Sequence, residues 1–444
     1  MDDLSFWNTQ EDGVDFVPTN KHVLFGHHYA SIAGAAPIIG PAVAVVYGWL
    51  PALLWVVLGV VFMGAMHDFA VLVLSMRHDG QSVGSISAKV LGPRTRTLFL
   101  LVIFALILIV VAVFAKAIAG LFVGFPGSVL PINFEIIVAL VVGWGCYKKK
   151  IPLLWPSIAA LIALYASVYV GVKVPLSLEA WFGARQMDAW VVFLLVYSFI
   201  ASVLPVWTLL QPRDYINSHQ LFIALGVIGL GMLVGWNEIV APVVNDVPEG
   251  SPAIFPFLFI TIACGAISGF HSLVSSGTTA KQIDKEPDAR YVGYMGAVGE
   301  GSLATGAVLA ATAGVVATRG EWDQLYPDFA TASGGAVGNF VNGVGVFANN
   351  LGIPLDLAVI FAAVVVISFA ATTMDTGVRL QRYIIQEWGH IYRVPLLTRR
   401  LPATLLAIVC CLALAFGAGG GTGGGGMVIW PLFGTTNQLL AGLT

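Results

Sequence analysis

Long apolar runs separated by short polar segments dominate the chain and predict a bundle of membrane-spanning helices. A helix needs about 20 apolar residues to cross a bilayer, and the hydrophobic runs supply about twelve such spans. We place them at residues 23–47, 49–76, 97–124, 131–147, 153–172, 190–211, 219–240, 252–280, 291–318, 355–386, 402–418 and 427–444. The predicted fold class is an all-α polytopic membrane protein with a single transmembrane domain over residues 1–444.

The basic residues orient these spans. Cytoplasmic loops carry an excess of Lys and Arg. If the polar segment 1–22 lies inside, the cytoplasmic segments contain 17 of the 21 basic residues, the others being Lys116, Lys173, Arg185 and Arg319. This pattern predicts a multi-pass membrane protein with a cytoplasmic N-terminus. Residues 319–354 then form a long outside loop, with a gating or partly re-entrant segment as the alternative.

Two of the predicted spans contain residues that interrupt helices. Residues 25–41 read FGHHYASIAGAAPIIGP, and residues 261–279 read TIACGAISGFHSLVSSGTT. In a helix interior Gly costs about 1 kcal/mol and Pro about 3 kcal/mol relative to Ala. Open backbone at membrane depth is tolerated only where protein or a watery cavity satisfies it. Two interrupted spans that run in opposite directions are typical of an inverted-repeat transporter, whereas small residues that only allow close helix packing are the structural alternative.

Composition narrows the class of partner. The chain is 58% hydrophobic and 10% charged, which is typical of a protein embedded in a lipid bilayer, and its net charge of −3 argues against a nucleic-acid partner. One lysine lies within a span, so an anionic substrate would depend on the positive N-termini of broken helices. This arrangement fits a small carboxylate or the C-terminus of a peptide, and the sequence leaves the oligomeric state open.

Ionisable groups inside a membrane are costly and mark functional sites by default, and hydroxyl oxygens beside an interrupted helix can hold Na⁺. The predicted substrate-binding residues are His27, His28, Ala33, Gly34, Ala35, Pro37, Gly265, Ser268, Gly269, His271, Ser275 and Ser276. The predicted ion-coupling residues are Asp68, Glu300, Ser368, Thr372, Thr373 and Asp375. Two structural alternatives remain open: an ion pair between Glu300 and His271, and Ser or Thr hydroxyls bonded to their own helix backbone.

Other functions remain as alternatives. A metal- or haem-binding membrane protein could use His27, His28, His67 and His271, although neighbouring histidines point about 100° apart on a helix and no HExxH motif is present. A nutrient receptor could bind substrate without moving it. We expect no enzymatic activity, no bound metal and no cofactor, and H⁺ or Na⁺ as the coupling ion.

Several long motifs resemble those of the carbon starvation protein A (CstA) family. They are EDGVDFVPT at 11–19, VLFGHH at 23–28, AGAAP at 33–37, GFHSLVSSGTT at 269–279, MDTGVRL at 374–380 and WPLFGTTNQ at 430–438. The resemblance implies a prokaryotic inner-membrane secondary transporter, induced by carbon starvation, for peptides or for pyruvate, with pyruvate uptake coupled to protons.

The CstA family is in turn similar to the amino acid–polyamine–organocation superfamily, which implies a leucine-transporter-like inverted-repeat core. On this analogy, spans 23–47, 252–280 and 355–386 are the first, sixth and eighth helices, and the eighth supports a sodium site at Thr372 and Thr373. Two residues depart from the family pattern: Ala36 replaces a usual glycine, and His67 replaces a usual glutamine. Family members usually continue beyond these motifs, so we expect further helices at one or both ends.

Overall fold

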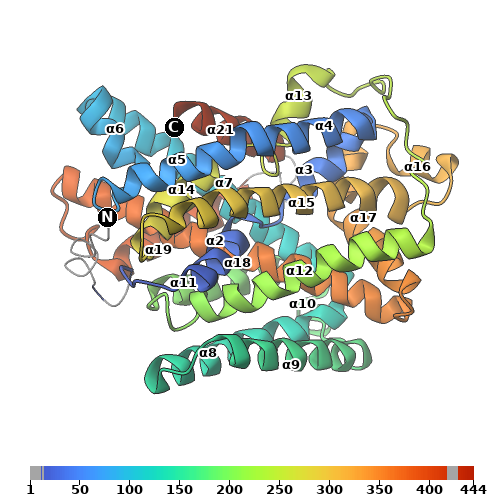
Figure 1. The fold of residues 1–444 in the computed structure, drawn as a ribbon, viewed down its shortest axis with the longest axis horizontal. Helices are drawn as coiled ribbons and strands as arrows, with labels where there is room; N and C mark the ends of the chain where they lie inside the picture. The colour runs from blue at the N-terminus through green and yellow to red at the C-terminus, as the bar shows by residue number, and fades with distance from the viewer. Residues whose placement is uncertain (1–11, 13–14, 418–428) are drawn as a thin grey trace.

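The protein is helical throughout the part of the chain that the structure describes. The structure is a computed structural model that describes residues 12, 15–417 and 429–444, and the only β contact among them is an isolated bridge between Thr19 and Ile283. Predictions for most of the polar segment 1–22 and for the start of the last span lie outside the described residues. The all-α fold class is confirmed (Figure 1).

Eight described helices are long and apolar enough to cross a membrane, or up to ten if two bent helix pairs each count as one span. The eight spans are Trp49–Met76, Arg96–Gly124, Pro126–Lys149, Leu154–Lys173, Glu179–Val203, Leu210–Gly235, Leu355–Ile391 and Arg400–Gly417. The total of twelve spans and the inverted repeat stay predictions.

Both predicted interruptions are present. The first span consists of α2 (Lys21–Ile32) and α3 (Ala36–Ala44), bent by 47° at residues 33–35. The second consists of α13 (Ile254–Thr261) and α14 (Gly269–Gly277), separated by residues 262–268. Gly265 has φ of +92°, a left-handed conformation that side chains other than glycine rarely adopt. Glycine therefore allows the chain to turn between α13 and α14.

The two interruptions lie against each other. If Gly40 of α3 carried a Cβ atom, as every residue other than glycine does, that atom would come within 2.3 Å of the Thr261 carbonyl oxygen. A Cβ atom at Gly265 would lie 3.5 Å from the Pro37 Cβ. Small residues thus bring the broken backbones into direct contact, as they do at helix interfaces in membranes. Residues 221 and 228 positions apart in sequence (Gly40 with Thr261, Pro37 with Gly265) thereby meet at one place in the core.

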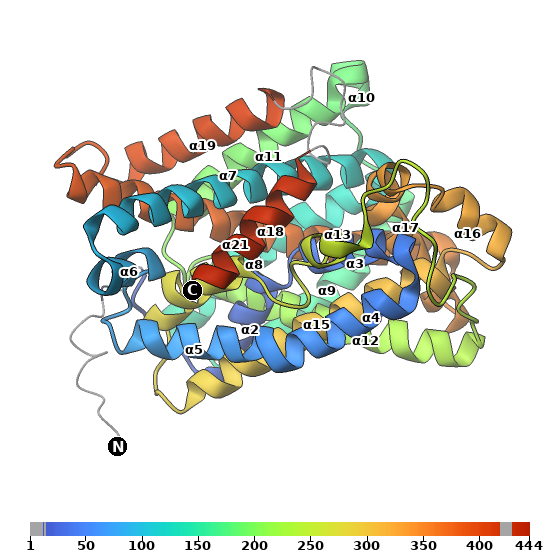
Figure 2. The ribbon, with the colours of Figure 1, turned by 90° about the horizontal axis from the view of Figure 1, so that it is seen from above.

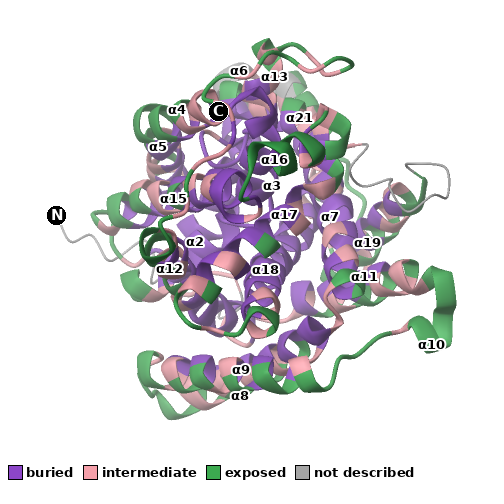
Figure 3. Ribbon diagram, turned by 90° about the vertical axis from the view of Figure 1, so that its right-hand side faces the viewer, coloured by how far each residue is buried: buried purple, intermediate pink, exposed green. Residues whose placement is uncertain are grey.

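Helix α18 (Leu355–Ile391) runs through the middle of the bundle and supports both interruptions (Figure 3). It packs against α7 (Pro93–Gly124), α17 (Phe329–Asn350), α19 (Arg400–Gly417) and α2. Seen from above, α7 and α19 lie on one side of α18, and α12 (Leu210–Gly235), α15 (Met295–Leu309) and α5 (Ala65–Met76) lie on the other (Figure 2). Helices α8 (Val129–Lys149) and α9 (Leu154–Lys173) form a pair at the edge.

Two predicted connections are wrong. Residues 319–354, expected to be an outside loop, contain α16 (Arg319–Leu325) and α17, whose Phe340 and Phe347 are buried. Helix α17 contains many glycine, alanine and asparagine residues, so its hydropathy is too low for a search based on apolar runs to find it. These small residues allow close packing against α18, α12 and α3. Residues 212–218, expected to be a cytoplasmic connection, are the first turns of α12, because their polar groups find partners inside the protein.

Candidate functional site

Three ionisable side chains from three separate elements meet beside the interruption between α13 and α14. His271 Nδ1 lies 2.7 Å from Asp68 Oδ2 of α5, and His271 Nε2 lies 3.2 Å from Glu300 Oε1 of α15. All three side chains are at most 2% exposed. We refer to Asp68, His271 and Glu300 as the central ion-pair chain; the structure thus brings together three of the predicted site residues.

The local backbone explains how these groups reach one another. The span that carries Asp68 contains a π-helical turn, Val60–Gly64, directly before α5. A carbon added at Gly64 would come within 2.2 Å of the Ala266 carbonyl oxygen. Glycine therefore lets this span touch the interruption itself, and Asp68, one turn later, faces His271. Single π-helical turns are frequent at functional sites.

Residues around the central ion-pair chain fix its geometry. His67 Nδ1 lies 3.2 Å from the second oxygen of Asp68, and its Nε2 lies 2.6 Å from the Thr444 hydroxyl. Asn437 caps α14, since its Oδ1 accepts a 2.7 Å hydrogen bond from the Phe270 backbone N–H. The α14 end of the interruption is therefore occupied by a side chain, and His271 is held in place by Asp68.

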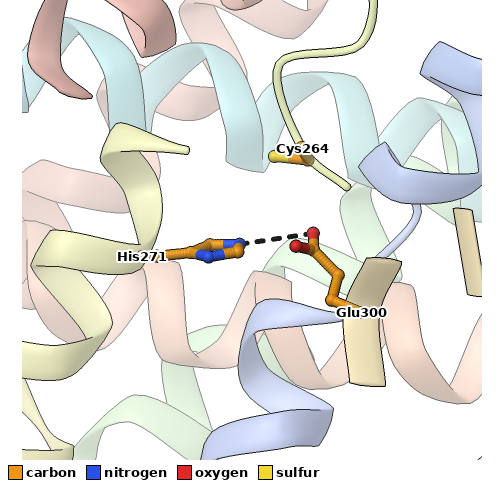
Figure 4. Close-up of side chains that lie close together, drawn as sticks. All are labelled: Cys264, His271 and Glu300. Atoms are coloured by element: carbon orange, nitrogen blue, oxygen red, sulfur yellow. Dashed lines mark ion pairs between the residues drawn. The ribbon is translucent and has the colours of Figure 1, made fainter. Parts of the chain in front are cut away.

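The sulfur of Cys264 also approaches this chain (Figure 4). Ligand-type atoms of Cys264, His271 and Glu300 lie within 4.8 Å of one another, and sulfur, imidazole and carboxylate are ligands that zinc accepts. The imidazole and carboxylate already pair with each other, and Cys264 Sγ lies 3.2 Å from the Ser268 hydroxyl. His271 Nε2 and Glu300 Oε1 are nevertheless buried without a hydrogen-bond partner, so the expectation of no bound metal stays a prediction.

The four histidines of the metal hypothesis do not converge in the described structure: His67 and His271 meet at Asp68, and the other two have different partners. His27 pairs with Asp214 of α12, and His28 Nδ1 lies 2.9 Å from the Thr279 hydroxyl. A carbon added at Gly296 of α15 would lie 2.7 Å from the His28 ring, so His28 faces the α14–α15 side. Its Nε2 is buried without a hydrogen-bond partner. Nε2 of His27 is likewise buried without a hydrogen-bond partner, so each of the two neighbours keeps one ring nitrogen free.

A second buried network contains residues that sequence reasoning did not select. Arg213 of α12 pairs with Asp375 of α18 and with Asp214, and the Ser198 hydroxyl donates 2.6 Å to the other oxygen of Asp375. The sequence signal was a run of Gln, Arg, Asp and Asn between two apolar runs, which we interpreted as a loop. Asp375, predicted as an ion-coupling residue, is therefore neutralised by an arginine.

The predicted sodium ligands all have hydrogen-bond partners. The Thr373 hydroxyl donates a 2.9 Å hydrogen bond to the Ser31 carbonyl, and the Thr372 hydroxyl accepts a 2.9 Å hydrogen bond from the Asn217 amide. The Ser368 hydroxyl donates a 2.6 Å hydrogen bond to Glu135 of α8. Thr373 does lie beside the α2–α3 interruption, as predicted. The other two contact α12 and α8 instead.

The remaining predicted substrate-binding residues are almost all buried. They are Ala33, Gly34, Ala35 and Pro37 at the first interruption and Gly265, Ser268, Gly269, Ser275 and Ser276 at the second. A carbon added at Gly34 would come within 2.3 Å of the Thr373 hydroxyl and 2.8 Å of Phe114. Helix α3 begins without a side-chain cap, in contrast to α14. In this conformation only a small group could occupy the space between the interruptions.

Comparison with known proteins gives matches over almost the whole chain. The carbon starvation protein CstA family matches residues 7–320 and 318–444. The peptide transporter CstA of Escherichia coli strain K12 is 35% identical over 97% of this chain and 69% of its own length. The peptide transporter CstA of Campylobacter jejuni is 32% identical over 98% of this chain and 69% of its own. The pyruvate/proton symporter BtsT of Escherichia coli is 32% identical over 97% of this chain and 70% of its own.

Proposed function

We propose, from the premise that this chain belongs to the carbon starvation protein CstA family, that it imports a small carboxylate such as pyruvate together with a proton. The chain is a transporter and not an enzyme, because the family and its relatives are transporters. We place it in the inner membrane with its N-terminus in the cytoplasm, as the distribution of basic residues indicates. The substrate and the coupling ion are the parts that need an experiment.

The observation that carries the proposal is the central ion-pair chain. When the imidazole is protonated, two carboxylates and one imidazolium have a net charge of −1; one further proton makes the chain neutral. Charge in a low-dielectric interior is costly, so the protonated and deprotonated chains favour different surroundings. Because the central ion-pair chain lies against the α13–α14 interruption, the binding of a proton to it is coupled to the position of α14.

The buried hydroxyls support a proton in preference to sodium. Sodium at Thr372 would compete with the Asn217 amide for the lone pairs of the hydroxyl oxygen, and the Thr373 hydroxyl, which donates to the Ser31 carbonyl, would add only a neutral ligand. Asp375, the nearest carboxylate in sequence, is already paired with Arg213. A proton needs no such rearrangement at the central ion-pair chain.

The shape of the interruptions supports a small substrate. The Gly34, Gly40 and Gly265 positions are all in close contact with neighbouring elements, which leaves no room for a peptide unless the helices separate. The uncapped N-terminus of α3 offers the Ala36 backbone N–H and a partial positive charge to a carboxylate, while Pro37 has no N–H and the Ile38 N–H bonds to the Ala35 carbonyl. We assign the substrate carboxylate to this end of α3, with His28 Nε2 as a further hydrogen-bond partner.

Uptake into proteoliposomes tests the proposal. Radiolabelled pyruvate should accumulate when the lumen is alkaline, and a sodium gradient of equal size should have no effect. Accumulation driven by sodium alone would refute proton coupling. If folded protein fails to accumulate pyruvate under either gradient but accumulates dipeptides, the substrate assignment is wrong. Exchange of labelled for unlabelled pyruvate without a gradient distinguishes a transporter from a receptor, which binds but does not exchange across the membrane.

A further inference from the structure

A cluster of cations lies on the predicted cytoplasmic side, away from the central ion-pair chain. Arg379 Nη1 of α18 lies 2.8 Å from Asp15 Oδ1, and Arg382 Nη2 lies 3.5 Å from the same oxygen. Lys281, at the end of the η5 turn Thr279–Lys281, places its ammonium 3.9 Å from the centre of the Tyr383 ring. We call Lys281, Arg379 and Arg382 the inner cation cluster.

Among the residues that the structure describes, the three cations of this cluster outnumber the carboxylates that act on them, Asp15 and Asp12. Both guanidinium groups are completely buried, and Asp15 is the one carboxylate that forms an ion pair with them among the described residues. Asp12 acts on Lys281 electrostatically, and the next acidic side chain on α18, Glu387, accepts hydrogen bonds from Ser82 and Ser85. Buried charges are normally paired. The cluster therefore has the capacity for a further anion.

Unsatisfied donors point to the same conclusion. Arg382 Nε and Nη1 and Arg379 Nε are buried without a hydrogen-bond partner. A buried donor without a hydrogen-bond partner is costly, and a planar guanidinium fork is suited to a carboxylate. Burial would by itself raise the pKa of Asp15, but Arg379, Arg382 and Tyr383 outweigh this effect and lower it to about 2. The cluster thus strongly favours a carboxylate in its anionic form.

A cavity reaches from Lys281 of this cluster to the inner half of the broken helix, and the two arginines lie behind its wall. Its volume is about 690 Å³, and its lining includes Phe16, Ser276, Gly277, Lys281, Leu380 and Tyr383. Ser276 and Gly277 are the last residues of α14. Lys281 belongs to the inner cation cluster, and its ammonium lies over the Tyr383 ring. An anion that leaves the α14 side inward would enter this cavity and meet Lys281.

We propose that Lys281, Arg379 and Arg382 form an inner anion site that receives the substrate carboxylate on its way to the cytoplasm, with Asp15 holding its place when substrate is absent. The identity of the ligand rests on the proposed function; the existence of the site rests on the unpaired guanidinium groups. Substrate and Asp15 compete for the same cations, so removal of the Asp15 charge should strengthen anion binding.

Chemical labelling of Lys281 tests the site directly. Burial lowers the pKa of Lys281 to about 8, although Asp15 opposes this effect, so at pH 8 about half of its amines are unprotonated and react with an acetylating reagent. Labelling of purified full-length chain in detergent, read by mass spectrometry, should fall when sodium pyruvate is added. Exposed Lys285 is the internal control, and neutral pyruvamide should give no protection.

Variants make the outcome decisive. In Asp15→Asn the pyruvate concentration that half-protects Lys281 should fall by about tenfold, and in Arg382→Gln protection should be lost, whereas Arg77→Gln, at an exposed ion pair, should behave as wild type. Lack of protection in both wild type and Asp15→Asn, or equal protection by pyruvamide, would overturn the site. Asp15→Asn leaves both buried arginines in place, so the test stands even if Arg382→Gln misfolds.

The labelling experiment needs no gradient, so its result is independent of the transport mechanism. Protection of Lys281 without gradient-driven accumulation would refute the proposed function and leave the site intact. Accumulation without protection would refute only the site. Equal protection by inorganic phosphate would show a general anion site and refute its assignment to the substrate carboxylate.

Discussion

The substitution Glu300→Gln should uncouple pyruvate transport from the proton gradient while preserving transport itself. Glutamine has almost the same shape as glutamate but carries no charge, so the central ion-pair chain becomes one carboxylate and one imidazolium. That state is neutral without an additional proton. The variant should therefore change between its inward and outward conformations without binding a proton at this site, and pyruvate should only equilibrate.

The expected effect is large compared with experimental error. If one proton accompanies each pyruvate anion, a gradient of one pH unit stores about 1.4 kcal/mol and supports an accumulation of about tenfold. In Glu300→Gln the ratio of internal to external pyruvate should fall to about one. Folding should tolerate the change: His271 keeps its 2.7 Å contact with Asp68, and the loss is limited to one charge-assisted interaction worth about 1.5–3 kcal/mol.

The assay compares two measurements on the same proteoliposomes. Accumulation under an imposed pH gradient should be lost, and exchange of labelled for unlabelled pyruvate at equal pH should continue. Glu135→Gln is the matched control, because Glu135 is also a buried carboxylate but bonds to Ser368 outside the central ion-pair chain. If Glu300→Gln still accumulates pyruvate about tenfold, the proton does not bind at this chain and our reasoning fails.

Three further predictions concern packing, charge and pH. Gly34→Ala should abolish uptake, since the added methyl group would meet a side chain at 2.3 Å, whereas Gly226→Ala, with no atom within 4 Å, should transport normally; equal uptake by both would contradict the close approach. Arg213→Gln should lower the free energy of unfolding by about 3–5 kcal/mol because it leaves a buried carboxylate unpaired, and Arg319→Gln, at an exposed pair, by at most about 1 kcal/mol; similar melting temperatures would count against a strong buried pair. The pKa of Asp15 is lowered from 3.8 to about 2, so its anion stabilises the folded state fully above pH 3.8 and ceases to do so as the pH falls through about 2. Asp15→Asn should thus cost about 2 kcal/mol equally at pH 5 and pH 6, below the pKa of about 8 of Lys281, and a difference between these two pH values in chemical denaturation would show that another group titrates.

The sequence by itself determined the helical class of the protein and the places where helices break. Runs of about 20 apolar residues have few structural solutions in a bilayer, and glycine and proline interrupt helices by local sterics. Residues 33–35 and 262–268 are therefore non-helical, as the sequence predicts. The motifs also identified the family, which the comparison confirms.

Local patterns failed where burial depended on distant partners. The sequence selected Asp68, His271 and Glu300 as separate candidates, but their spacing does not reveal that one imidazole lies between two carboxylates. It also treated Arg213 as a residue of an exposed connection, because a charge without a partner is too costly to bury. Its partner is 162 residues away in α18.

The tertiary structure decided which polar groups meet, and with that the chemistry of the site. Hydropathy measures the cost of placing each residue in lipid, whereas the stability of a buried charge depends on the atoms that surround it in the folded protein. The same limit concealed α17, whose small residues are only moderately apolar but pack closely against α18. Composition and helix-breaking residues thus determine where the helices lie and where they break. Contacts between distant segments determine which charged side chains can be buried between those helices.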